Sequence, residues 1–185
     1  MFSFKEAKDQ LDYLEPGLHI VRVVNAEGFN SDPETNKTGY ITVNFESETG
    51  KTIGRRWYTA AATTTDTKKI ANANKNVINR CFHVLKQFIK EDQAKAIEAR
   101  DFIDLAKILN KYINPKLLLR LKVIGEKGQD GKVYSGIGFP PFLEPLTENK
   151  LVFDPNDSKD NPVPDLATAQ AAATQIETKK EDLPF

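Results

Sequence analysis

Four consecutive side chains combine two fixed cations with two large aromatic rings: Arg55, Arg56, Trp57 and Tyr58. Guanidinium groups pair with phosphates, and flat rings stack on unpaired bases. The combination therefore favours contact with a single-stranded nucleic acid. Tyr40, in the preceding alternating segment, is a fifth candidate for the same surface.

These candidates lie on a predicted β-hairpin over residues 39–59. Ile41, Val43 and Phe45 alternate with polar residues, which is typical of a strand with one buried face. A glycine, Gly50, follows in the predicted turn and is free to adopt the positive φ that a three-residue hairpin needs. The hairpin therefore positions the rings and the cations on a β-ribbon.

The pairing register decides which candidate side chains point outward. A three-residue turn places Arg56 and Tyr58 on the outer face and keeps Ile53 in the core, and we prefer this arrangement for that reason. A two- or four-residue turn would place Arg55 and Trp57 there instead, since a slip of one residue exchanges the two faces. A bulge would expose members of both pairs.

Apolar spacing predicts the other elements around this hairpin. We expect a short helix ending before Pro16, a strand over 18–26, a helix from an N-cap at Asp66 to about residue 90, a helix over 101–112, and strands over 117–124 and 132–139. Residues 91–100 fit either a helix or a loop. Three strands, a helical insertion and two strands predict a mainly β protein, a five-stranded OB-fold barrel. A five-stranded sheet of another topology, or a larger α+β domain, remains an alternative.

The last two predicted strands extend the candidate binding face. Arg120 and Lys122 alternate with leucines, and Lys132 and Tyr134 lie on the non-core positions of the return strand. Cations along a groove release counterions when a nucleic acid binds, which makes affinity depend steeply on salt. We therefore include these four residues among the predicted DNA-binding residues.

The composition divides the chain into two parts, residues 1–146 and 147–185. The second part holds eight acidic residues and four lysines, a formal charge of −4, which leaves +4 on the first part. Few large apolar residues occur after residue 146, so this part cannot bury enough surface to offset its ordering entropy. We expect an OB domain followed by a disordered acidic tail.

The chain ends in an acidic and apolar tip: Glu181, Asp182, Leu183, Pro184 and Phe185. Such a tip suits a partner pocket with an apolar floor and a basic rim. It resembles the C-terminus of bacterial single-stranded DNA-binding proteins, in which several acids precede Ile-Pro-Phe, with Leu183 replacing the usual isoleucine. The resemblance implies an OB domain that binds the strand and a tip that recruits replication and repair proteins. Over roughly residues 14–145, the body is diffusely similar instead to phage-encoded single-stranded DNA-binding proteins.

Several catalytic interpretations fail on spacing. Lys51 and Thr52 follow Gly50 as in a phosphate loop, but Phe45 stands where that motif requires its first glycine, and a strand follows instead of a helix. One cysteine and two histidines are too few for a zinc site. Cys81 lies on the apolar stripe of its helix, which indicates a core residue. We therefore predict no enzymatic activity, no metal and no cofactor.

The residues predict a non-enzymatic protein that binds single-stranded DNA, and the resemblances imply that a phage encodes it and that it coats and protects the strand in replication, recombination and repair. The tip would recruit polymerase, helicase or nuclease partners. The single cysteine and the lack of a long apolar run predict a cytoplasmic protein without a membrane, in the host cytoplasm if a phage encodes it. The alternatives are a protein-interaction adaptor and a nuclease, and a homo-oligomer is left open.

Overall fold

The computed structural model describes residues 13–163, which form a mainly antiparallel β-sheet with three helices. The elements in chain order are β1 (Gly17–Phe29), β2 (Tyr40–Ser47), β3 (Thr52–Tyr58), α1 (Thr67–Leu85), α2 (Glu91–Lys95), α3 (Phe102–Tyr112), β4 (Leu119–Lys127), β5 (Val133–Gly136) and β6 (Leu143–Pro145). The helices occur between the third and fourth strands, as the sequence predicts.

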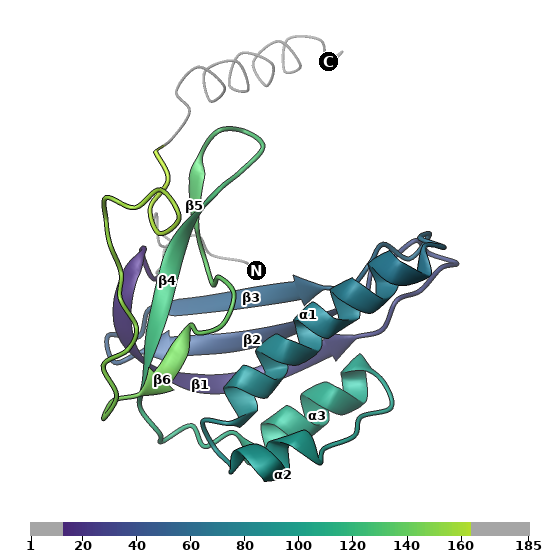
Figure 1. The fold of residues 1–185 in the computed structure, drawn as a ribbon, viewed down its shortest axis with the longest axis horizontal. Helices are drawn as coiled ribbons and strands as arrows, with labels where there is room; N and C mark the ends of the chain where they lie inside the picture. The colour runs from purple at the N-terminus through teal and green to yellow at the C-terminus, as the bar shows by residue number, and fades with distance from the viewer. Residues whose placement is uncertain (1–12, 164–185) are drawn as a thin grey trace, which may run out of the picture.

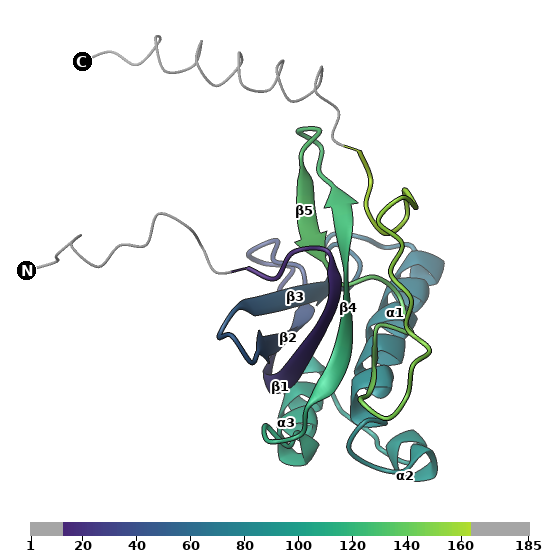
Figure 2. The ribbon, with the colours of Figure 1, turned by 90° about the vertical axis from the view of Figure 1, so that its left-hand side faces the viewer.

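The strands are hydrogen-bonded in the order β3-β2-β1-β4-β5, and β6 pairs with β4. Figure 1 shows β1, β2 and β3 running across the view, with β4 and β5 crossing them steeply. Helix α1 lies over one face of β1–β3, and α3 lies beside β1 (Figures 1 and 2). Among residues 13–163, no helix covers the other face of these strands.

The hairpin adopts the preferred register. Tyr40 pairs with Tyr58 and Phe45 pairs with Ile53, while Ile41 is completely buried. The turn glycine has a φ of 78°, in the region that favours glycine. The alternation of apolar and polar residues is therefore sufficient to set both the strands and their faces.

Two helices begin at aspartates that cap exposed backbone amides. Asp66 accepts hydrogen bonds from the Lys68 and Lys69 amides, at 3.0 and 3.1 Å, and Asp101 accepts one from Asp104 at 2.8 Å. Helix α1 ends at Leu85 rather than near residue 90, and the undecided segment 91–100 contains the short α2.

Strand β1 extends to Phe29, beyond the predicted end at residue 26, and it contains a bulge. Its pairing with β2 shifts between Val23 and Asn25. The extra residue exchanges the faces, so Ala26 is buried and Phe29 is aligned with Tyr40 on the outer side.

Residues 13–163 form a sheet of six strands rather than the expected five. β5 ends at Gly136 rather than near residue 139, and the chain then forms β6, which pairs with the first residues of β4 on the edge away from β1. This pairing continues the ladder, since the Lys122 amide donates to the Phe142 carbonyl at 2.8 Å. Only the tertiary fold shows this short strand, because three residues carry no periodic pattern.

The predicted N-terminal helix is wrong for its last residues. Tyr13 forms a parallel bridge with Thr52, and Leu14 is buried in the core. Residues 1–12, where the rest of that helix was expected, lie outside the described range. None of the helices in residues 13–163 combines the length and apolar character needed to cross a bilayer.

Candidate nucleic-acid interface

Three aromatic rings and one guanidinium lie together on the outer face of β1, β2 and β3. Phe29 and Tyr40 are stacked, with centroids 5.6 Å apart and planes inclined by 21°. Tyr40 and Tyr58 meet edge to face at 5.8 Å, and the Arg56 guanidinium lies 4.8 Å from the Tyr40 centroid. We call Phe29, Tyr40, Arg56 and Tyr58 the ring cluster.

The ring cluster has the chemistry for holding an unpaired base beside a phosphate. Tyr58 is 54% exposed, so its ring is accessible for stacking. Hydrogen bonding with Tyr58 and the nearby Tyr40 raise the pKa of Arg56 above its ordinary value, so the guanidinium keeps its charge. The geometry brings together Tyr40, Arg56 and Tyr58 as the sequence predicts.

Trp57 and Arg55 do not join this face, which corrects two predicted contacts. Trp57 is 2% exposed and packs against Phe142, with ring centroids 5.7 Å apart. Arg55 forms an ion pair with Glu126 of β4. Both residues occupy positions of β3 whose side chains point inward. The register that exposes Tyr58 therefore turns Arg55 and Trp57 away from the outer face.

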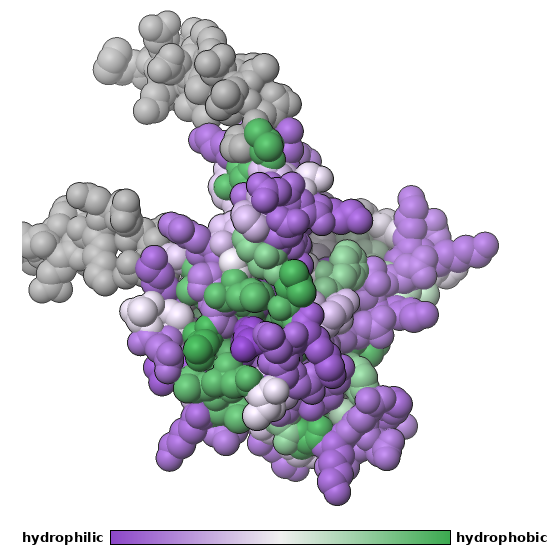
Figure 3. Space-filling model, turned by 60° about the vertical axis from the view of Figure 1, so that its left-hand side comes forward, coloured by the Kyte–Doolittle hydropathy of each residue, from purple (hydrophilic) through white to green (hydrophobic). Residues whose placement is uncertain are grey.

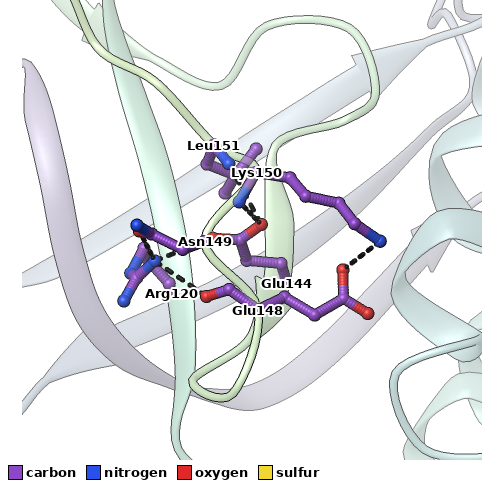
Figure 4. A network of polar contacts seen from close by, with 6 residues as sticks. All are labelled: Arg120, Glu144, Glu148, Asn149, Lys150 and Leu151. Atoms are coloured by element: carbon purple, nitrogen blue, oxygen red, sulfur yellow. Dashed lines mark hydrogen bonds and ion pairs between the residues drawn. The ribbon is translucent and has the colours of Figure 1, made fainter.

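Arg120 is held in a polar network that the residues after β6 close over it (Figure 4). Its guanidinium donates to the Glu144 carboxylate at 3.0 Å, to the Glu148 carbonyl at 2.9 Å and to the Asn149 side chain at 2.7 Å. The buried Glu144 also accepts the Lys150 and Leu151 amides, both at 3.0 Å. These partners satisfy Arg120, so the predicted DNA contact is corrected to a structural one.

Lys122 is neutralised in the same way. Its ammonium group lies 2.6 Å from Asp160, and that carboxylate also accepts the Asp154 amide at 2.9 Å. Burial acts to raise the pKa of Asp160, but the hydrogen bonds from Lys122 and the Asp154 amide outweigh it and lower the pKa. The predicted DNA contact of Lys122 is therefore corrected to an ion pair within the protein.

Residues 147–163, which the sequence assigns to the tail, pack against β4. Leu151 is buried, and Glu144, Asp160 and their partners join this segment to the sheet. The apolar content of the segment is low, but two charged networks and one leucine are enough to order it. The predicted tip, residues 181–185, lies outside the described range.

Lys132 and Tyr134 lie on the β4–β5 hairpin, which Figure 1 places apart from the end of the sheet where β2 begins and β3 ends. Lys132 is exposed, and Tyr134 is 52% exposed. The Tyr134 hydroxyl donates to Asp130 at 2.6 Å, which raises the pKa of Tyr134 and lowers that of Asp130. The fold therefore does not bring these two residues to the ring cluster.

Sequence reasoning missed Phe29, which stacks on Tyr40. A strand without a bulge would have turned this ring to the opposite face, so the alternation of apolar and polar residues could not have predicted its position.

A hollow of about 530 Å³ lies at the ends of β1 and β3. Asn30 and Thr59, the residues after Phe29 and Tyr58, line it together with Ile70 of α1.

The described residues hold no cluster of three or more histidine, cysteine or acidic side chains able to bind a metal ion. Burial raises the pKa of Cys81 to about 12, so the thiol is neutral and inert, as expected for a core residue. His83 is also buried, and its Nε2 accepts the Phe142 and Leu143 amides at 3.2 and 3.1 Å.

Acidification is expected to destabilise the protein through His83. Burial, with the charge of Lys86, lowers the pKa of His83 from 6.5 to about 4. Because the unfolded histidine takes up the proton first, its contribution is complete above pH 6.5 and is lost as pH falls toward 4. The free energy of unfolding is expected to fall by about 3 kcal/mol over this range. Denaturant unfolding of wild type and His83→Gln across this range measures it; parallel pH profiles would contradict the assignment.

A comparison with protein-family models finds no match, and a comparison with curated proteins also finds none. On the face that Figure 3 presents, patches of apolar residues lie between hydrophilic residues.

Proposed function

We propose that this protein binds single-stranded DNA without catalysing a reaction on it, through the ring cluster on the outer face of β1–β3. The observation that carries the proposal is the row of Phe29, Tyr40 and Tyr58, with Arg56 beside the middle ring. Bases stack on such rings whatever their sequence, and the guanidinium neutralises a neighbouring phosphate. Coating of exposed strands during replication, recombination and repair, in a phage system, would use this mode of binding.

An OB-type barrel is the fold that we propose for the sheet. Support comes from β1, which pairs with both β2 and β4, and from the helices placed between β3 and β4. The ion pair between Arg55 and Glu126 further connects β3 to β4. In OB folds the second and third strands carry the oligonucleotide, and the ring cluster lies mainly on those two strands.

Recruitment of other proteins is the second part of the proposal. The tip from Glu181 to Phe185 has acids for a basic rim and a terminal ring for an apolar pocket. Polymerase, helicase and nuclease proteins that work on the same DNA are the proposed partners.

The experiment that tests the proposal is a titration of fluorescein-labelled oligo-dT, followed by anisotropy, beside a duplex of the same length. We expect binding to the single strand at low salt, weakening as salt is raised, and at least about tenfold weaker binding to the duplex, whose bases are not free to stack. An absence of oligo-dT binding at low salt would refute the proposed function.

A protein-interaction adaptor is the second candidate. The hollow between α1 and α3 favours it, since Ile70, Ile78 and Leu105 give that surface an apolar lining. An adaptor would capture a protein partner while showing no salt-dependent affinity for oligo-dT, so the same titration separates the two candidates.

A further inference from the structure

Helix α1 presents a basic surface that contains no carboxylate. Six cationic residues and no acidic residue occur between positions 67 and 90. Lys68, Lys69, Lys75 and Lys86 are exposed, and none of them forms an ion pair within residues 13–163. By contrast, Arg120 and Lys122 of β4 are both neutralised by carboxylates. Helix α1 therefore carries several positive charges that no carboxylate pairs with among residues 13–163.

An exposed aromatic ring lies next to this basic surface. Phe139 is 65% exposed, although its ring is one of the large apolar groups of the chain. The Arg80 guanidinium of α1 lies 4.1 Å from the Phe139 centroid and 5.9 Å from that of Trp57, so it lies against both rings. This contact anchors Phe139 to α1 while much of the ring stays open to solvent.

A hollow of about 380 Å³ lies between Phe139 and α1. Asn76, Asn79 and Lys86 contribute to its lining. Asparagine amides offer both donors and acceptors, which is what the edge of an unpaired base requires. A stacking ring, amide groups and a lysine thus meet at one hollow, with further lysines along the same helix.

We propose that α1 and Phe139 form a second surface for single-stranded DNA, distinct from the ring cluster. An unpaired base stacks on Phe139, and phosphates of the same strand pair with Lys75 and Lys86. These two lysines are separated by about 16 Å along the helix axis, from its rise per residue. The inference rests on the proposed function and adds a second contact region to it.

The two surfaces lie on opposite sides of β1–β3. Ile41 and Val43 point into the core that Val77 of α1 shares, so the alternate residue Tyr40 points away from α1. In Figure 1, α1 lies in front of these strands, and its outward side faces away from them. One strand must pass around the domain to reach both surfaces, so a short oligomer will occupy only one of them.

The test compares oligo-dT of about 10 nucleotides, within the roughly 4–16 nucleotides that one OB-type face covers, with oligo-dT of about 60. The double variant Lys75→Glu/Lys86→Glu is expected to bind the long strand at least about tenfold more weakly, and the short strand within about twofold of wild type. Phe139→Leu, which keeps an apolar contact with Arg80, is expected to weaken long-strand binding about fivefold or more. Circular dichroism melting verifies that both variants fold.

The control is Lys107→Glu/Lys116→Glu, which makes the same change in net charge on exposed residues of α3 and the following loop. Failure of the wild type to bind either oligomer would refute the proposed function itself. If the wild type binds, equal long-strand affinity in the α1 variant and the control would overturn only the second surface. Equal losses on both oligomers would overturn it too, because α1 would then be the primary site.

Discussion

Tyr40→Ala/Tyr58→Ala is expected to bind oligo-dT roughly 30- to 20,000-fold more weakly than wild type, since each stacked base contributes about 1–3 kcal/mol. Tyr58 is more than half exposed, and Tyr40 stacks on Phe29 at the surface, so the substitutions remove binding area without opening the core. Fluorescence anisotropy at fixed salt measures the change in affinity.

Arg56→Gln is expected to reduce the slope of log affinity against log salt concentration by about 0.7, because one phosphate contact is lost.

The matched control for this experiment is Tyr134→Ala. Tyr134 has nearly the same exposure as Tyr58, but its hydroxyl is bonded to Asp130, whose negative charge disfavours a nearby phosphate. We expect its affinity for oligo-dT to stay within about threefold of wild type, well below the stacking contribution of one base. A larger loss in Tyr134→Ala than in the double variant would move the binding face to the β4–β5 hairpin and disprove the ring cluster as the site.

Trp57→Ala is expected to lower the free energy of unfolding by about 3–5 kcal/mol, because it leaves a large cavity in the core. The Trp57 ring is almost fully buried between Phe142 and the Arg80 guanidinium. Chemical denaturation followed by far-ultraviolet circular dichroism measures the change. Tyr58→Ala, at the adjacent but exposed position, should cost less than about 1 kcal/mol.

A second variant separates packing from binding at this position. Trp57→Phe keeps an aromatic ring in the core and is expected to fold and to bind oligo-dT as tightly as wild type. Reduced affinity in a folded Trp57→Phe protein would show that Trp57 contacts DNA, and a small stability loss in Trp57→Ala would contradict its place in the core.

Features governed by neighbours in the sequence could be predicted without coordinates. Alternation over β2 and β3, with Gly50 in the turn, was sufficient to place Tyr40 beside Tyr58 and to bury Ile53. The N-cap at Asp66 was predicted for the same reason, because a capping side chain bonds amides only two or three residues ahead.

Features that depend on distant segments could not be predicted in this way. The short β6 and the ordered residues 147–163 carry little apolar pattern, and they are held by β4 and by the charges of Arg120 and Lys122. Whether a lysine faces solvent or a carboxylate depends on which chain segment packs over it. The alternation of apolar and polar residues along one strand does not predict that segment.

The sequence by itself determined the hairpin, its faces and the capped helices, because each depends on interactions between residues that are close along the chain or joined by one turn. Sequence alternation identified Tyr40, Arg56 and Tyr58, and the tertiary structure changed the rest of the candidate site. It added Phe29 through a bulge and withdrew Arg120 and Lys122 into ion pairs. It also left Lys68, Lys69, Lys75 and Lys86 of α1 exposed and without an ion pair among the described residues.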